Sequence, residues 1–340
     1  MGSFQEEGHV KLIIIAVLIC LVTCFGLISN IIGICTIWKI PKTCKLFNHM
    51  VICLLVFDCW FLTASPLFFF GLQHEYFSCK LCAWLLSYWA VPCGYMAVFG
   101  TILMTLAISH ERYLVIRNPF HYNQALLSDR AQKKRLLIYL VPALTISIIF
   151  SIPRFFVFEI RTNSTTNAIT IPLTNLGCDQ DYLLYYEFLA STILFGVIPF
   201  VLLTFMCYKT LKKLRSHNTE LRLAGINNEN SSHVRRQQEE QMAKVMVGLV
   251  VEFLILHFVR IFLNIYSGIM ERCNRCDNKE ITWPLDSYGI VVHLSVLMVM
   301  VNASIDTITY CAINSEFRRQ LFCNLKGILK WRTIFKKTSV

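Results

Sequence analysis

The sequence predicts an all-α membrane protein, a seven-transmembrane helix bundle with a short amphipathic C-terminal helix. Two observations predict this fold. Of the 340 residues, 55% are hydrophobic and only 16% are charged, which is too little charge for the surface of a soluble protein of this length. The apolar residues also form seven long blocks, and each block provides the roughly 20 helical residues needed to cross a hydrocarbon core.

The seven blocks follow one another through short polar connections, which leave no room for a second soluble domain. Pro66 and Pro199 interrupt the second and fifth blocks, where packed neighbours can satisfy the freed backbone groups. We expect an N-terminal tail over residues 1–11, a seven-helix domain over 12–313, and an amphipathic helix with a tail over 314–340. The blocks cover residues 12–38, 47–72, 81–108, 136–158, 182–208, 242–270 and 283–313.

Positive charge gathers on one side of the predicted bundle. Of the 32 Lys and Arg residues, 24 lie in the connections 1–2, 3–4 and 5–6, at the start of the sixth block or after the seventh block. Such regions stay in the cytoplasm, so the N-terminus is expected outside and the C-terminus inside a multi-pass protein of the plasma membrane. The basic residues of these inner regions then face anionic lipid, which indicates membrane lipid as a partner. The net charge of +11 therefore gives no evidence for nucleic-acid binding.

Polar residues inside the apolar blocks are candidates for function, because they are costly in a bilayer. Asn30, Asp58, Asn302 and Asp306 are expected to form one buried polar network. Hydrogen bonds that only hold the helices together are the alternative interpretation. Asp58 with its polar neighbours also predicts a bound Na⁺, an oxygen-loving cation. No other metal or cofactor is predicted.

A charged triplet, Glu111-Arg112-Tyr113, stands at the inner end of the third block, and Pro119 follows it. Arg112 and Glu111 are expected to pair locally. Breaking that pair would free the guanidinium group to meet an incoming cytosolic partner.

The cysteines of the outer connections face an oxidising compartment, where disulfides persist. A bridge from Cys178 to either Cys79 or Cys82 would tie the loop between helices four and five over the mouth of helix three, with Cys79 slightly favoured. Cys273 and Cys276 form a CxxC pair, for which a local disulfide is expected because two further zinc ligands are not evident nearby.

Two other positions predict covalent modification. Asn163 begins an Asn-Ser-Thr sequon in an outer loop and is expected to be glycosylated. Cys323 follows the last block among basic residues, where palmitoylation and an unmodified thiol are both open.

These motifs, in this order, resemble the rhodopsin-like (class A) G-protein-coupled receptors. The charged triplet resembles the family's (D/E)RY motif, and residues 302–310 resemble its NPxxY region. Asn30, Asp58 and Pro199 stand at the family's polar and proline positions in helices one, two and five, and residues 314–319 resemble its short amphipathic helix. The resemblance implies a heterotrimeric G protein as partner. The residues that it assigns to coupling and activation are Glu111, Arg112, Tyr113, Asp306 and Tyr310.

A narrower likeness is to invertebrate FMRFamide-type neuropeptide receptors. It rests on residues 88–94, on Ser151-Ile-Pro153-Arg154-Phe-Phe, and on residues 253–266, which resemble a FxxCHxPR stretch. This likeness implies an extracellular peptide ligand. The pocket residues expected from it are Tyr88, Gly94, His257, Arg260 and Tyr266.

The sequence also departs from the family pattern. Val259 and Thr307 replace the prolines of helices six and seven, and His257 holds the place of the common Trp. The usual kink of helix six therefore loses its covalent cause. The family's helix-three cysteine would fall at Ser87, which keeps the choice between Cys79 and Cys82 open.

The sequence lacks the residues that would bind two known classes of ligand. Helix seven has no lysine for a retinal Schiff base, and Gly94 stands where a receptor for amines needs an aspartate. The acidic outer loops favour a peptide that bears Arg. The alternatives are an orphan receptor for a non-peptide ligand and a membrane transporter, although no internal repeat is present. An enzyme is not expected, because no HExxH or Ser/His/Asp grouping stands out.

Overall fold

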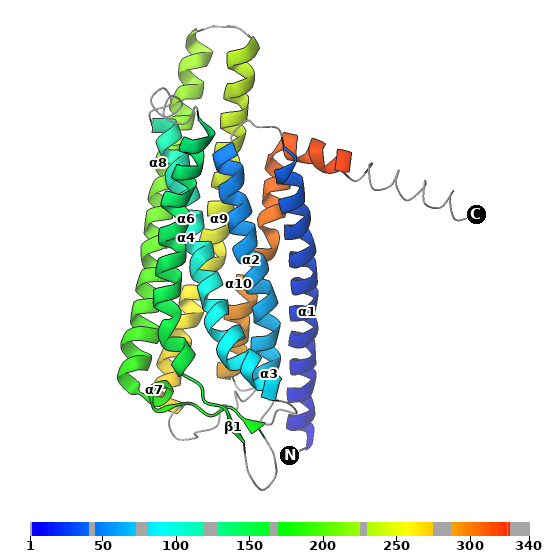
Figure 1. Ribbon diagram of the computed structural model, residues 1–340, viewed down its shortest axis with the longest axis vertical. Coiled ribbons are helices and arrows are strands. Elements are labelled where there is room, and N and C mark those ends of the chain that lie inside the picture. The colour runs from blue at the N-terminus through cyan, green and yellow to red at the C-terminus, as the bar shows by residue number, and fades with distance from the viewer. Residues whose placement is uncertain are drawn as a thin grey trace, which may run out of the picture.

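The computed structural model describes the backbone of residues 2–40, 45–72, 80–117, 128–162, 169–224, 230–274, 287–324 and 326. Within these ranges, seven helices are long and apolar enough to cross a membrane. They stand side by side as an upright bundle (Figure 1). The predicted fold class is therefore confirmed.

The helices agree with the predicted blocks, and several begin earlier or continue further. The first, sixth and seventh are the continuous helices α1 (Gly2–Trp38), α9 (Asn230–Asn274) and α10 (Ser287–Ile313). The second is α2 (Lys45–Leu72). Helix α1 runs back through most of the expected N-terminal tail, and its membrane-spanning part begins at Ile13.

The third, fourth and fifth helices are each assembled from segments of different helical pitch. The third comprises α3 (Lys80–Trp84), the π-helical η1 (Leu85–Ala90) and α4 (Val91–Arg117). The fourth is α6 (Asp129–Ser151), which ends in a 3-10 turn, η2 (Ile152–Phe156). The fifth comprises η3 (Tyr182–Ala190) and η4 (Ile193–Val197), both π-helical, and α8 (Ile198–Ala224). Sequence patterns did not predict these changes of pitch.

Two short elements mark opposite ends of the bundle. A hairpin of β1 (Arg161–Thr162) and β2 (Ile169–Thr170), followed by α7 (Asn175–Cys178), joins the fourth helix to the fifth. A helix over residues 315–324 follows α10, and the Asn314 side chain caps it by accepting from two backbone N–H groups. We call these the hairpin end and the C-terminal end (Figure 1).

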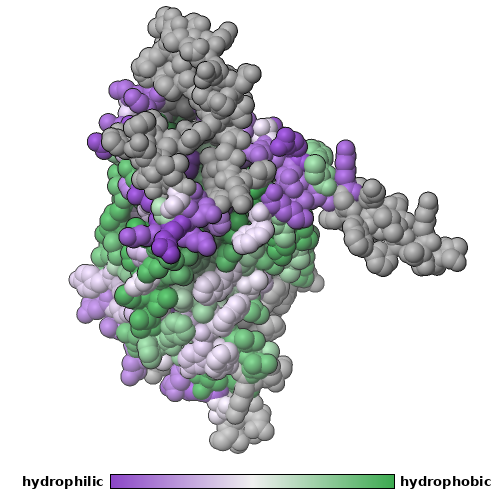
Figure 2. Space-filling view, turned by 45° about the horizontal axis from the view of Figure 1, so that its top comes forward, coloured by the Kyte–Doolittle hydropathy of each residue, from purple (hydrophilic) through white to green (hydrophobic). Residues whose placement is uncertain are grey.

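The outer surface of the bundle is apolar where lipid would contact it. Large hydrophobic side chains such as Ile28, Ile149 and Phe262 are about 60% exposed, which a soluble protein would avoid. Figure 2 shows hydrophobic side chains gathered between two hydrophilic ends. The bundle therefore has the surface of a protein whose solvent is lipid.

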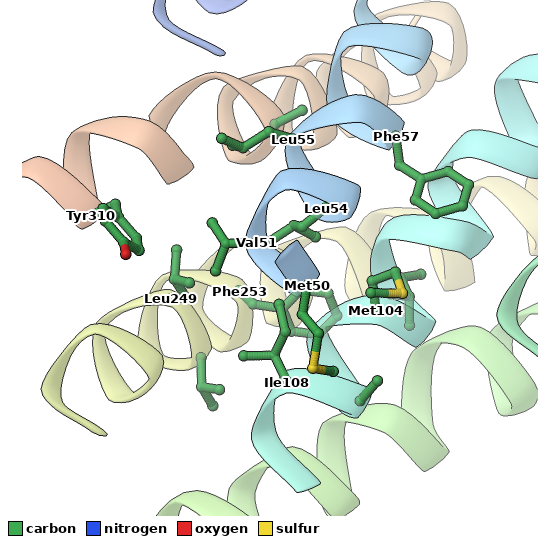
Figure 3. Close-up of a cluster of buried hydrophobic side chains, with 14 of the residues drawn as sticks. Met50, Val51, Leu54, Leu55, Phe57, Met104, Ile108, Leu249, Phe253 and Tyr310 are labelled. Atoms are coloured by element: carbon green, nitrogen blue, oxygen red, sulfur yellow. The ribbon is translucent and has the colours of Figure 1, made fainter. Parts of the chain in front are cut away.

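The third helix forms the centre of the bundle. In its most apolar stretch 72% of the residues are buried, compared with 22% in the first helix and 17% in the fourth. Helix α4 contacts α2, α6, α8 and α9. In Figure 3, Met50 and Leu54 of α2 lie with Met104 and Ile108 of α4 in the buried cluster that they share with α9 and α10.

The close approach of α2 and α4 requires a glycine at position 100. A Cβ atom at Gly100 would lie 2.3 Å from the Phe57 ring. We predict that Gly100→Ala lowers the free energy of unfolding by about 1–3 kcal/mol, because the ring would have to move in a filled core. Thermal unfolding of the purified protein measures this change.

Gly94→Ala is the matched control, since its Cβ would meet only Ala64, at an ordinary distance of 3.5 Å. The double variant Phe57→Ala, Gly100→Ala should be insensitive to the added methyl group when compared with Phe57→Ala alone. Equal stability of the wild-type protein and the Gly100→Ala variant would contradict this account of the interface.

Candidate functional site

At the C-terminal end, the fully buried Glu111 carboxylate of α4 pairs with the fourth helix. Arg135 Nε lies 3.2 and 3.3 Å from its two oxygens, and the Tyr139 hydroxyl donates to it over 2.6 Å. The expected local pair of Glu111 and Arg112 is wrong, since no such contact occurs in the described part of the chain. Adjacent residues on a helix point about 100° apart, so Glu111 reaches α6 while Arg112 turns elsewhere.

Arg112 lies against an aromatic face. It is 5% exposed, and its guanidinium carbon sits 4.5 Å from the centre of the Phe47 ring of α2. Its Nε has no hydrogen-bond partner. Tyr113, beside it, is half-buried. A cation over an aromatic ring is held more loosely than one in an ion pair with a carboxylate, so Arg112 keeps donors for another group.

Tyr310 joins the second, sixth and seventh helices at this end. Its hydroxyl donates to Asn48 Oδ1 over 3.1 Å and lies 3.9 Å from Met242 Sδ. Its ring stacks on Phe47 and meets the edge of Phe317 from the 315–324 helix. Tyr310 and Arg112 therefore share the ring of Phe47.

The expected polar network divides into two parts at mid-bundle. Asn30 donates to the Ala303 carbonyl over 2.7 Å and accepts from Thr307 over 3.0 Å, which ties α1 to α10. Asp58 instead accepts from Thr101 over 3.0 Å and is hydrogen-bonded to Asp306. Within the described residues, no hydrogen bond joins the two parts. Thr307, where the family has a proline, supplies the hydroxyl group that orients Asn30.

Glu252 of α9 extends the second part into a chain of three carboxyl groups. Asp306 is hydrogen-bonded to both Asp58 and Glu252, and Thr309 donates to Glu252 over 2.5 Å. A hydrogen bond between two carboxyl groups requires a proton on one of them. This chain links helices two, six and seven inside the membrane. Sequence patterns did not assign Glu252 to a site, and the available signal was an acidic residue alone in an apolar block.

A small cavity lies beside Asp58. It has room for about one water molecule, and its polar lining comes from Asp58, Thr101, His257 and Asn302. Three buried atoms of that lining have no hydrogen-bond partner: Asp58 Oδ2, His257 Nε2 and Asn302 Oδ1. The two oxygens are the kind of ligand that a Na⁺ ion would bind. In the described part of the chain, no group of three or more His, Cys, Asp or Glu side chains is arranged to hold a metal.

The predicted pocket residues lie in different surroundings. His257 is buried and stacks on Phe253, with ring centres 3.6 Å apart. Arg260 is half-buried, one turn closer to the hairpin end, in electrostatic range of Tyr95 and Arg154. Gly94 packs near Ala64 of α2. Of the five predicted residues, Gly94 and His257 are buried, and Arg260 is half-buried.

Tyr88 is half-buried against Trp84, and the side chain of Tyr266 lies outside the described residues.

The fourth helix supplies a buried cation that the sequence did not assign to a site. Arg154 is 1% exposed and lies 3.8 Å over the Tyr95 ring, near Tyr186 and Glu187. In the sequence, Arg154 stands out only as part of residues 151–156, which resemble FMRFamide-type receptors. An arginine at the end of an apolar block was the available signal.

The predicted modifications remain predictions. Cys82 is exposed on α3, which contacts β2, and Cys178 is half-buried in the cluster at the hairpin end. Cys323 is exposed on the 315–324 helix. The sites outside the described side chains are Cys79, Asn163, Cys273 and Cys276.

A seven-helix membrane bundle with these motifs at the C-terminal end and at mid-bundle defines the class of seven-transmembrane receptors. Residues 29–310 match the family described as 7 transmembrane receptor (rhodopsin family). Because the match covers most of the chain, the protein belongs to this family, the class A G-protein-coupled receptors. It is a multi-pass plasma-membrane protein and a receptor rather than an enzyme.

Two curated receptors are similar to the chain at low identity. The FMRFamide receptor of Drosophila melanogaster is 21% identical over 332 residues, which is 92% of this chain and 54% of that receptor. The neuromedin-U receptor 2 of Mus musculus is 23% identical over 334 residues, 93% of this chain and 76% of that receptor. The chain thus spans about half the length of the FMRFamide receptor that it matches.

The bond between Tyr139 and Glu111 should contribute to stability. We predict that Tyr139→Phe lowers the free energy of unfolding by about 1.5–3 kcal/mol, since it removes a donor from a buried carboxylate. Thermal unfolding of purified protein in lipid nanodiscs tests this. Tyr185→Phe, at a 62% exposed tyrosine, is the control and should have little effect. Equal loss in both variants would show that Tyr139 has no special role.

Proposed function

We propose that this protein is a receptor that converts the binding of an extracellular neuropeptide into activation of a heterotrimeric G protein. Arg112 carries the proposal. It is a buried cation at the C-terminal end, held by the Phe47 ring, and has an unused Nε donor. Within the described residues Arg112 has no ion pair. A G-protein segment with carbonyl or carboxylate acceptors can therefore bind Arg112 once the helices around it separate.

The orientation that this function needs has the hairpin end outside the cell and the C-terminal end in the cytoplasm. The excess of Lys and Arg in the connections at the C-terminal end supports it. On the 315–324 helix, Phe317 is buried while Arg319 is exposed. Arg318 donates to the last carbonyls of α10. This helix therefore suits the interface with anionic lipid, where Cys323 is a candidate for palmitoylation.

Activation would separate α9 from α10 at the C-terminal end. Helix α9 is held to α10 by the Glu252 bonds to Asp306 and Thr309 and by the contact of Met242 with Tyr310. The Gln241–Ser315 hydrogen bonds hold it to the 315–324 helix. A ligand that binds the separated arrangement more tightly raises its population. A Na⁺ ion at Asp58 Oδ2 and Asn302 Oδ1 would favour the closed arrangement, because both oxygens border the central cavity.

A peptide is the proposed ligand class. The two similar receptors are named for FMRFamide and neuromedin-U, and this chain lacks the lysine and aspartate anchors for retinal and amines. The disulfide between Cys178 and Cys79 or Cys82, the second disulfide of Cys273 and Cys276, and glycosylation at Asn163 belong to the same extracellular surface.

The test of function is nucleotide exchange on G proteins by cells that display the receptor, with a panel of peptides as probes, each tested with a free and with an amidated C-terminus. Arg112→Ala is expected to abolish peptide-driven exchange at unchanged surface expression, because it removes the guanidinium that meets the G protein. Arg117→Ala, an exposed arginine on the same helix, is the control. Full exchange by the Arg112→Ala variant would refute this role.

Glu252 gives a separate prediction about basal activity. Glu252→Ala is expected to raise ligand-independent exchange about fivefold or more, because two hydrogen bonds that hold α9 to α10 are lost, each worth about 1 kcal/mol. Glu252→Gln should raise it less, since an amide can still bond to Asp306 and Thr309. Glu240→Ala, on the same helix, is the control. Basal exchange that is unchanged in Glu252→Ala would contradict the proposed tie.

A further inference from the structure

The hairpin end holds a buried arginine with more than half of its hydrogen-bond donors unused. Arg154 Nη1 donates to the Phe150 carbonyl over 3.4 Å and to the Tyr186 hydroxyl over 3.3 Å. Both bonds are long, and the Tyr186 hydroxyl itself donates to Phe150. Arg154 Nε and Nη2 are buried and have no hydrogen-bond partner. A buried guanidinium without an acceptor is costly, so these two atoms indicate a group that is still to bind.

The two unused atoms form one edge of the guanidinium plane. Nε and Nη2 point the same way, and this edge accommodates both oxygens of a carboxylate with two parallel hydrogen bonds. Glu187 lies close enough to interact with the Arg154 charge, but it does not bond to this edge, because Nε and Nη2 have no hydrogen-bond partner. The geometry of Arg154 therefore fits an incoming carboxylate.

A second cation faces the same region. Arg260 of α9 is half-buried and lies within electrostatic range of both Arg154 and Tyr95. Two guanidinium groups that repel each other in a low-dielectric interior are stabilised by an anion between them. Glu187 supplies one negative charge nearby, which leaves the group of three with one excess positive charge.

The walls around Arg154 are aromatic. Tyr95 lies under the guanidinium, Tyr186 stacks on Phe150 with ring centres 4.8 Å apart, and Tyr182 stacks on Tyr186 at 5.1 Å. The Tyr182 hydroxyl is buried without a hydrogen-bond partner. These side chains come from the third, fourth and fifth helices, and Arg260 adds the sixth. An apolar wall with a few convergent donors is the usual form of a ligand site.

We infer that Arg154 and Arg260 together form a subsite for a carboxylate group of the ligand, carried on an aromatic or apolar residue. The inference rests on the proposed receptor function and adds the ligand's chemistry. It also limits the neuropeptide class: a peptide that presents a free carboxylate to the bundle is favoured over one that presents only a C-terminal amide.

The test uses the full-length protein in lipid nanodiscs and two matched probes, N-acetyl-L-phenylalanine and N-acetyl-L-phenylalaninamide. They share the aromatic ring and differ in the negative charge. Affinities are obtained from the rise in unfolding temperature with probe concentration. The carboxylate is expected to bind at least about tenfold more tightly than the amide, because only the carboxylate makes charge-assisted bonds.

Three variants assign the preference to the site. Arg154→Lys keeps the charge and removes the two-donor edge, and Arg260→Gln removes the second cation from a half-buried position. Each should reduce carboxylate affinity to near that of the amide. Arg161→Gln removes an exposed arginine of the hairpin that pairs with Glu159, and it should keep the preference. Unfolding without probe shows whether each variant is folded.

Equal binding of the two probes, or binding of neither, overturns the subsite. A preference for the carboxylate that persists in both Arg154→Lys and Arg260→Gln also overturns it. The same holds if Arg161→Gln loses the preference to the same extent as these two variants. Nucleotide exchange separates this failure from failure of the proposed function. A carboxylate preference without any peptide-driven exchange supports the subsite and refutes the receptor function, and peptide-driven exchange without the preference does the reverse.

Discussion

The structure depends on the rule that polar groups inside a bilayer must find partners within the protein. Helix α10 supplies most of these partners. Its backbone and side chains hold Asn30 of α1, Asp58 of α2 and Glu252 of α9. In water each of these bonds would exchange with solvent at little cost. In lipid no solvent replaces them, so they fix how the helices are rotated and which of them can separate.

Helix α9 connects the three polar regions of the bundle. At the C-terminal end Met242 touches Tyr310, and at mid-bundle Glu252 joins the carboxyl chain. His257, which stacks on Phe253, borders the small cavity beside Asp58, and Arg260 lies one turn further toward Arg154. A change at Arg260 can therefore reach the contacts with α10 through one continuous helix. No proline interrupts it, since position 259 is valine.

Length and hydropathy were enough to predict the seven helices, because a bilayer sets a minimum apolar length. Side-chain partners were harder to predict. Glu111 pairs with Arg135 rather than Arg112, since the partner depends on how α4 and α6 are rotated, which the sequence of either helix does not state. The link between Glu252 and Asp306 joins residues 54 positions apart and depends in the same way on the packing of α9 against α10.

The local changes of pitch in the third and fifth helices were also beyond sequence reasoning. Runs such as residues 182–190 are apolar and read equally well as α-helix. In this run Tyr182 and Tyr186 both lie near Arg154 of the fourth helix, a contact between helices that the sequence of the run does not state. The likeness of residues 151–156 to neuropeptide receptors pointed to this place in the chain, and the three-dimensional contacts give it a chemical role.

In the proposed function, α9 is held against the bundle at the C-terminal end of the molecule and moves outward when a G protein binds. Spin labels carried by unnatural amino acids at the exposed positions Arg117 of α4 and Lys244 of α9 would report this distance directly. In the receptor alone, pulsed electron resonance should give mainly one short distance. With a nucleotide-free G protein bound, a longer distance should dominate. An identical distance distribution in both samples would refute the outward movement of α9.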